Sequence, residues 1–450
     1  MATKSSVEQS FLTAFENNMA DPSNMDKLGI GYKAFMESGN TQVADGLAVY
    51  DPTKPYGMLW NDIEDTYFRL GHSIPTVQQQ MRRVVTIGNP QFGGSVYKYL
   101  DADDSTKFED GSDATAYVSN AAGTYQVMVE IPKCYTHRYK DGANNYRWMS
   151  IKNFEGGSTD KAFRMSGWTD SGDGTDEAHE SPYTYISAFE GVLYDGTTSN
   201  SCIDGTGNTG ANTANDKIIS TAGFKPWTDE TIVTGRTLIT NSGGKQFDWH
   251  RYSLMRMCFE IEYLTQDSQT AIPGYTENTS GANFNNDVMK TGLTLSLGNN
   301  SGSASGSANH IAGGGDGGFS GVVANSYRGI ENFYGHLWQW VDAINMSNYV
   351  SFICGIDDTF ASDSFVSPYV SSGHTQPNTN GYQSKVTADY LVEAVGSSST
   401  SKVTDYYYQS YENRVLLSGG GLDDSSRAGL SSLSSSSSSS TVYWALVSRC

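Results

Sequence analysis

"RGIENFYGHLWQWV", residues 328–341, is the aromatic stretch on which the fold prediction rests. Within it, Trp338 and Trp340 alternate beside Leu337 and Val341. A period of two is typical of a β-strand, whose successive side chains point to opposite faces of a sheet. The stretch therefore predicts a buried strand.

A helix is predicted ahead of this strand, in "FDWHRYSLMRMCFEIEYLTQ" (247–266). Its apolar side chains recur every three to four residues, at Leu254, Cys258, Ile261, and Leu264 or Thr265. This spacing marks the buried face of a helix. A Gly-, Ser- and Asn-rich stretch, 295–321, reads as a long loop between the helix and the strand.

Strand-like runs separated by Gly, Asn and Asp turns occupy 46–153, which we predict to be a β-rich subdomain. They are "RRVVTIG" (82–88), "SVYKYLD" (95–101) and "YQVMVEIPKCYTHRYK" (125–140). A second β segment, "YTYISAFEGVLYDG" (183–196), alternates in the same way. Short strands and long loops agree with the 48 glycines and 28 tyrosines of the chain.

An amphipathic helix is predicted near the N-terminus, after Ser5 and Ser6. Its apolar residues follow an i, i+4 stripe: Val7, Phe11, Phe15 and Met19. Two interpretations stay open, a helix packed on its own domain and a helix that trimerises or docks on a larger assembly. We assign 1–45 as an attachment or oligomerisation segment.

Composition excludes several classes of function. Of the 450 residues, 37% are hydrophobic, which is ample for a packed core. The formal net charge of -20 argues against binding to nucleic acids or anionic membranes, both of which attract positively charged proteins. Neither an apolar h-region at the N-terminus nor a stretch long enough to cross a bilayer is present in the sequence. We expect synthesis in the cytoplasm without a signal peptide, no nucleic-acid partner and no membrane insertion.

The sequence offers no constellation of catalytic or metal-ligating residues. Its five cysteines are widely separated, which favours free buried thiols over disulfides or a zinc site: Cys134, Cys202, Cys258, Cys354 and Cys450. The seven histidines never fall at HxH or HxxxH spacing. The acidic runs 101–113, 170–177 and 203–216 lack the order of a calcium loop, so we predict solvated loops. No cofactor is predicted, and a structural calcium ion remains an alternative that no motif supports.

The order of four segments resembles the formylglycine-generating-enzyme variant of the C-type lectin fold. They are "WHRYSLMRMCFEIEYLTQD" (249–267), "RGIENFYGHLWQWV" (328–341), "NRVLLSGGG" (413–421) and "ALVSRC" (445–450). The resemblance spans about Tyr183 to Cys450. It implies an α+β protein in which 154–450 is a C-type-lectin-like domain, behind a small N-terminal helix and β subdomain.

The resemblance does not extend to the enzyme's active site. That family needs paired cysteines in its C-terminal part, whereas Cys354 and Cys450 are isolated here. Iron-dependent relatives need a His-rich triad, which the sequence lacks. His336 and Gln339 replace the Asn and Glu of the family's GNVWEW motif, which argues against an inherited calcium site. We therefore expect a fold without enzymatic activity.

More narrowly, four runs look like phage tail-fibre and prophage proteins with a variable C-terminal region: "MRRVVTIG" (81–88), "VYKYLDADDSTKFEDG" (96–111), "VMVEIPKCYTHRYKDG" (127–142) and "YISAFEGVLYDG" (185–196). That group is similar to the major tropism determinants and is often associated with diversity-generating retroelements. The resemblance implies recognition of a host surface, a homotrimer, and a place in the virion tail fibre.

The segment 418–443, "SGGGLDDSSRAGLSSLSSSSSSSTVY", contains no Lys, Glu, Gln, Met or Trp. These are the residue types that codons of the form NNC cannot encode, so the pattern is consistent with adenine mutagenesis of AAC codons. Simple low complexity explains the same observation, but the family resemblance favours diversification. The serine run is followed by the β-prone, apolar stretch "TVYWALV" (441–447), which we expect to lie in the core. The serines are therefore held at both ends by ordered segments and do not form a free tail.

We predict that 418–444 forms the receptor-binding region, with side chains that face outward. The predicted binding residues are Leu422, Asp423, Asp424, Arg427, Ser431, Ser432, Leu433, Ser434, Ser436, Ser438 and Tyr443. Serine adapts to many partners but anchors few, so we expect weak binding per site and avidity from multivalency. The partners would be a host cell-surface receptor, protein or glycan, and other tail proteins bound through the N-terminal segment. The alternatives are a structural fibre or decoration subunit and, less favoured by the residues, a formylglycine-type oxidase.

Overall fold

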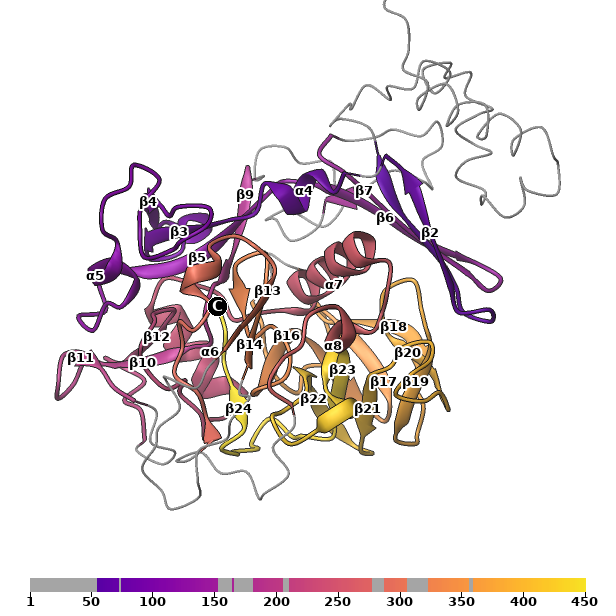
Figure 1. Ribbon diagram of the computed structural model, residues 1–450. Coiled ribbons are helices and arrows are strands. Elements are labelled where there is room, and N and C mark those ends of the chain that lie inside the picture. Colours follow the sequence, from indigo (N-terminus) through magenta and orange to yellow (C-terminus); the bar gives the residue numbers. More distant parts are fainter. Residues whose placement is uncertain are drawn as a thin grey trace, which may run out of the picture. The chain divides into compact units, whose positions relative to one another are not determined.

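The computed structural model describes residues 55–72, 74–152, 164–165, 181–204, 210–276, 287–305, 323–355 and 359–450. In these ranges the protein is mixed α+β and mostly β-sheet, as predicted (Figure 1). The predicted N-terminal helix and the acidic run 170–177 lie outside them.

The chain divides into two compact units. One comprises Met1–Thr76 with Cys134–Arg164, and the other comprises Val77–Lys133 with Met165–Cys450. This division differs from the predicted boundaries at 45/46 and 153/154. Residues 77–133 join the larger unit because Met128–Pro132 of β5 (Gln126–Pro132) pair with β9 (Tyr183–Ser187), about 55 residues further along the chain.

The first unit is built on a five-stranded sheet of order β2-β1-β7-β6-β8. Its strands are β1 (Tyr56–Asn61), β2 (Thr66–Gly71), β6 (Tyr135–Asp141), β7 (Asn144–Ser150) and β8 (Arg164–Met165). Leu59, Leu70 and Tyr146 form its buried cluster. The predicted run 125–140 is thus two strands in two units, interrupted after Pro132, which has no N–H to continue a ladder.

The second unit begins with a four-stranded sheet of order β4-β3-β5-β9 and two three-stranded sheets, β11-β10-β12 and β13-β14-β15. The strands not yet bounded are β3 (Arg82–Ile87), β4 (Ser95–Tyr99), β10 (Val192–Asp195), β11 (Ser201–Cys202), β12 (Lys217–Ile219), β13 (Gly302–Ser305), β14 (Val323–Tyr327) and β15 (Ile330–Glu331). The short helical turn α4 (Thr76–Gln79) precedes β3, and three others connect the later strands: η2 (Pro90–Phe92), α5 (Thr115–Val118) and η5 (Leu295–Leu297). The strand predictions at 82–88, 95–101 and 183–196 are confirmed.

The predicted helix at 247–266 is confirmed as α7 (Trp249–Tyr263). It begins because the carboxylate of Asp248 accepts hydrogen bonds from the backbone N–H groups of His250 and Arg251, at 2.9 and 3.0 Å. It is buried on nearly all sides, beyond the predicted apolar stripe. Two shorter helices flank it, α6 (Ile232–Asn241) and α8 (Ser268–Ala271).

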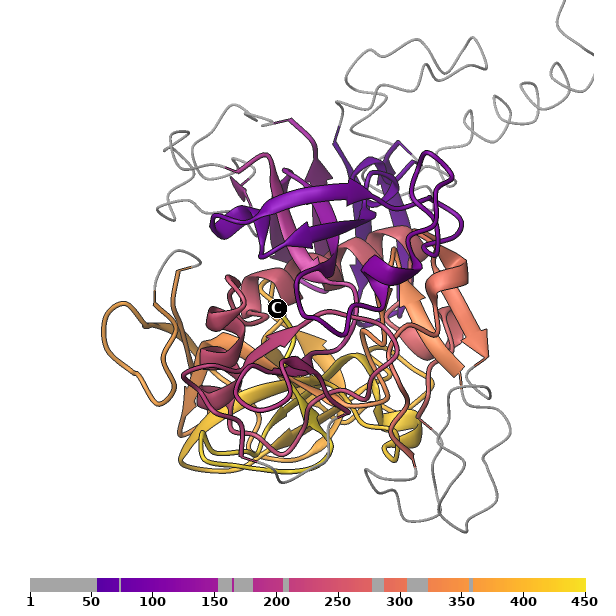
Figure 2. The same cartoon turned by 90° about the vertical axis from the view of Figure 1, so that its left-hand side faces the viewer.

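A nine-stranded sheet forms the C-terminal half of this unit, in the order β18-β17-β16-β22-β23-β21-β19-β20 with β24 beside β16. Its strands are β16 (Trp338–Ser347), β17 (Val350–Ile353), β18 (Val370–Thr375), β19 (Gly381–Val386), β20 (Val392–Val395), β21 (Tyr406–Gln409), β22 (Asn413–Gly419), β23 (Gly429–Ser435) and β24 (Leu446–Val447). The predicted strand at 337–341 is confirmed, with Trp340 fully buried. In both cartoon views the C-terminus lies among the strands of this unit, and Cys450 is buried (Figures 1 and 2).

Candidate functional site

The serine-rich segment divides at Ser435 into a buried strand and an exposed turn. Residues 429–435 form β23, which pairs with β22 on one side and β21 on the other. The side chains of Ser431, Ser432 and Leu433 are at most 1% exposed. The prediction that they face outward is wrong, because both edges of the strand are paired and both faces are covered.

The other predicted binding residues are distributed between the core and the surface. Leu422, Asp424 and Ser434 are buried as well, so the prediction of outward side chains is also wrong for them. Four of the predicted binding residues are exposed: Asp423, Arg427, Ser436 and Tyr443. Ser438 is half-buried. The stretch 441–447 is divided similarly, because Ala445, Leu446 and Val447 are in the core whereas Val442 and Tyr443 are exposed.

Serine suits the buried strand because its hydroxyls find partners there. Ser432 Oγ donates to the carbonyl oxygen of Tyr406 at 3.3 Å, and Ser435 Oγ lies 3.0 Å from the Tyr407 hydroxyl. Ser434 Oγ lies 2.8 Å from Ser436 Oγ. Buried hydroxyls that are hydrogen-bonded in this way cost little stability.

Asp405 fixes the start of β23. Its Oδ2 accepts the backbone N–H of Ser431 at 2.6 Å, and a Cβ at Gly429 would lie 2.1 Å from its Oδ1. Glycine at 429 therefore leaves room for this carboxyl group. Burial raises the pKa of Asp405 to about 8, so the group is largely protonated at neutral pH.

Four half-buried aromatic rings lie in contact beside the segment, and we call them the ring surface: Trp338, Tyr382, Tyr406 and Tyr408. Ring centroids are 5.1 Å apart for Tyr382 and Tyr406, 4.7 Å for Tyr406 and Tyr408, and 5.9 Å for Tyr408 and Trp338. Because residues i and i+2 of a strand share a face, β21 directs Tyr406 and Tyr408 to the same side, whereas Tyr407 is fully buried on the other.

An exposed cation adjoins these rings. The guanidinium carbon of Arg427 lies 5.9 Å from the ring centroids of both Tyr406 and Tyr408. Arg427 Nε donates to the carbonyl oxygen of Asp424 at 3.3 Å, which orients the side chain. Asp424 also accepts the Tyr408 hydroxyl at 2.9 Å and the backbone N–H of Gly421 at 2.8 Å. This carboxylate thus ties the turn 421–427, which includes η6 (Ser425–Arg427), to the ring surface.

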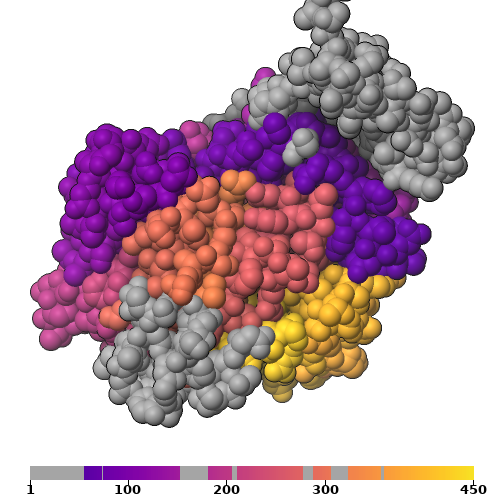
Figure 3. Space-filling model, in the orientation of Figure 1, coloured from indigo at the N-terminus to yellow at the C-terminus, as the bar shows by residue number. Residues whose placement is uncertain are grey.

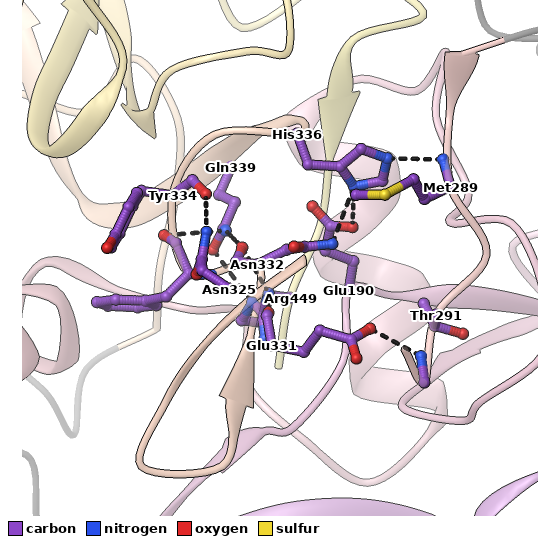
Figure 4. A network of polar contacts seen from close by, with 12 residues as sticks. Glu190, Met289, Thr291, Asn325, Glu331, Asn332, Tyr334, His336, Gln339 and Arg449 are labelled. Atoms are coloured by element: carbon purple, nitrogen blue, oxygen red, sulfur yellow. Dashed lines mark hydrogen bonds and ion pairs between the residues drawn. The ribbon is translucent and has the colours of Figure 1, made fainter. Parts of the chain in front are cut away.

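A buried polar network surrounds His336 (Figure 4), and the backbone around His336 also holds the segment that leads into the turn. The carbonyl oxygen of His336 accepts the backbone N–H of Leu422 at 2.9 Å, and Gly335 N–H donates to the carbonyl oxygen of Gly419, also at 2.9 Å. His336 Nδ1 lies 2.6 Å from Glu190 Oε2, and the backbone N–H of Met289 donates to its Nε2 at 2.9 Å. Nε2 therefore acts as a hydrogen-bond acceptor, which leaves Nδ1 placed to donate a hydrogen bond to Glu190.

Arg449 closes the same network. It is fully buried and donates to the carbonyl oxygens of Ser187 and Glu331, at 2.8 and 2.7 Å, and to Gln339 Oε1 at 3.1 Å. Burial lowers its pKa to about 10. The hydrogen bond between Arg449 and Gln339 gives both buried polar side chains a partner, and it helps to position the C-terminal residues.

The buried polar network of Glu190, His336 and Arg449 bonds only within the protein, whereas the exposed side chains of the turn 421–427 are accessible to a ligand. Glu190 and His336 are at most 1% exposed, so a substrate does not reach them in this conformation. All five cysteines are free and buried, and burial raises the pKa of Cys134, Cys202 and Cys450. In the described part of the chain, no group of three or more His, Cys, Asp or Glu side chains is placed to hold a metal ion.

Sequence reasoning missed the ring surface, since its members come from strands far apart along the chain. The local signal is the alternation in "DYYYQ" (405–409), with one tyrosine inward between two outward ones. No protein-family model matches the chain, and no curated protein sequence is significantly similar to it. None of the helices in the described ranges combines the length and apolar composition of a membrane span.

Proposed function

We propose that the chain is the receptor-binding protein of a phage tail fibre, and that its larger unit has a C-type-lectin-like fold of the formylglycine-generating-enzyme type. The spatial arrangement of the segments that carry the resemblance supports the fold. Helix α7 contacts β16, and both β22 and β24 pair with β16. Segments separated by up to about 200 residues thus adjoin one strand.

The observation that carries the proposed activity is the ring surface with Arg427 beside the exposed part of the C-terminal segment. Tyrosine, tryptophan and arginine are the residue types that dominate binding energy at interfaces. Tyrosine and tryptophan also lose little conformational entropy on binding, and mutual ring contacts reduce that cost further. The C-terminal part of the chain reaches the surface in Figure 3, where it is coloured yellow.

The structure changes how the segment 418–444 would act in that role. Diversified positions would divide between β23, where partners on both sides favour small side chains, and the exposed residues 423, 426, 427, 436, 440, 442 and 443. The ring surface lies outside 418–444, so its anchors would be common to all variants. A homotrimer, held to other tail proteins through the N-terminal segment, would multiply a modest affinity.

The test is binding of the labelled full-length protein to cells of candidate host bacteria. We expect the double variant Tyr406→Ala/Arg427→Ala to lose at least about tenfold in cell binding. The control is Tyr411→Ala, which removes an aromatic ring that is 58% exposed and lies outside the ring surface. Equal binding by the double variant and the wild type would leave the chain as a structural fibre or decoration subunit.

A further inference from the structure

We infer that the ligand of the ring surface is an uncharged saccharide, bound without a metal ion. The inference rests on the proposed receptor-binding function and names the chemistry of the receptor. Three features carry it: half-buried aromatic rings in mutual contact, a pair of opposite charges on the adjoining turn, and hydroxyl groups around them.

The rings offer an apolar contact that suits a sugar. The face of an aromatic ring carries partial negative charge, and the C–H groups on the face of a pyranose ring are weakly positive and apolar. Neighbouring rings of the surface meet at interplanar angles of 86°, 50° and 73°. A row of tilted rings fits a ligand of several linked units better than one flat group.

The charges at the edge favour a ligand with no net charge. Arg427 and Asp423 are both exposed, on the same short turn. Within the described ranges, neither Nη1 nor Nη2 of Arg427 makes a hydrogen bond, and the Asp423 carboxylate is bonded only to its own backbone N–H. One donor group and one acceptor group of opposite sign match the hydroxyls of a sugar, each of which both donates and accepts.

Charge also argues against an acidic ligand. The chain carries a formal net charge of -20, and the pKa of Asp423 is raised by burial and by neighbouring Asp424, so this turn already holds two acidic groups near one cation. An anionic saccharide would add a third negative group. The hydroxyl of Ser426, 2.9 Å from the Tyr382 hydroxyl, extends the polar edge without adding charge.

The ligand would not need calcium. Both oxygens of the Asp424 carboxylate are already engaged, Oδ1 by the Tyr408 hydroxyl and Oδ2 by the Gly421 N–H. Asp423 alone does not make a cation site. Binding through rings and hydroxyl hydrogen bonds is therefore expected to persist in a chelator.

The experiment screens the full-length protein against two matched panels of oligosaccharides. One panel holds neutral oligomers of glucose, galactose, mannose and N-acetylglucosamine, and the other holds the corresponding oligomers with a carboxylate on one sugar. We expect binding to members of the neutral panel, unchanged by EDTA, and changed less than about threefold between 50 and 500 mM salt because no net charge is neutralised.

Variants assign that binding to the site. Tyr406→Ala, Asp423→Ala and Arg427→Ala are each expected to weaken binding of the neutral oligomer by about tenfold or more. Tyr406→Phe keeps the ring and removes a hydroxyl that makes no hydrogen bond to any described residue, so binding should stay within about threefold. Tyr411→Ala is the matched control, and thermal unfolding checks that each variant is folded.

Each outcome separates the two proposals. Binding of carboxylated oligomers alone, or binding lost in EDTA, would overturn this inference. If the protein binds host cells but no oligosaccharide, and protease treatment of the cells abolishes binding, the receptor is a protein and only this inference fails. If it binds neither cells nor oligosaccharides, the proposed function fails with it.

Discussion

The two halves of the serine run, 431–435 and 436–440, are both mostly serine but lie in different environments. Ser431, Ser432, Ser434 and Ser435 are at most 4% exposed within β23. Ser436 and Ser440 are exposed, and the backbone between them turns, with Thr441 N–H donating to the carbonyl oxygen of Ser438 at 3.1 Å. The residue type is therefore not what decides between strand and turn.

The neighbouring strands make the difference. Strand β21 ends at Gln409, which is paired with Ser435, and Ser410 N–H makes the last contact with the Ser435 carbonyl oxygen at 3.2 Å. Beyond that point β23 has lost one of its two partners. A segment without apolar periodicity thus becomes a buried strand wherever paired strands enclose it, because backbone hydrogen bonds need no particular side chain.

The largest expected effect comes from placing the same charged side chain in each half. Ser432→Arg buries a guanidinium at a site that is 0% exposed and should destabilise the protein by about 3–5 kcal/mol. Ser440→Arg should change the free energy of unfolding by less than about 0.5 kcal/mol, since Ser440 is exposed. Urea denaturation followed by intrinsic fluorescence measures both. Similar losses in the two variants would contradict the assignment of a buried and an exposed half.

A smaller effect is expected from the carboxyl group at the start of β23. The pKa of Asp405 is about 8 in the folded protein and 3.8 for an ordinary aspartate, so the folded state retains a proton that the unfolded chain releases. The stabilisation is complete below about pH 4, is lost progressively as pH rises to about 8, and does not change further above that.

The measurement is the urea midpoint of the wild type and Asp405→Asn between pH 5 and pH 9. The wild type should lose stability across this range more steeply than the variant, in which the amide does not titrate. Glu230 is a second buried acid with a pKa of about 8, distant from β23 in sequence, so Glu230→Gln is the control for its share of the slope. If Asp405→Asn leaves the slope unchanged, Asp405 is not the group that titrates.

Sequence reasoning succeeds here where a local pattern coincides with burial. The helix at 249–263 follows from its period of 3.6, and the first part of β16, at 338–341, follows from its period of two. It fails at β23, where five of the seven residues are Gly or Ser and the deciding contacts are with β21 and β22. For the same reason the ring surface was not predicted, since only the sheet brings residues 338, 382 and 406–408 together.

The smallest effect on stability is expected from substitutions in the exposed half of the serine run, 436–440, where a change in receptor binding should still be measurable. Ser436→Tyr with Ser440→Tyr adds two rings to exposed positions and should shift the free energy of unfolding by less than about 0.5 kcal/mol. Cell binding should change in strength or host range, because large side chains at the exposed half can reach a ligand and those of the buried half cannot. The matched control Ser431→Tyr with Ser435→Tyr should unfold the sheet instead, as both sites are at most 2% exposed. Unaltered binding by the first pair would mean that the exposed half of the run does not contact the receptor, and would restrict recognition to the turn 421–427 and the ring surface.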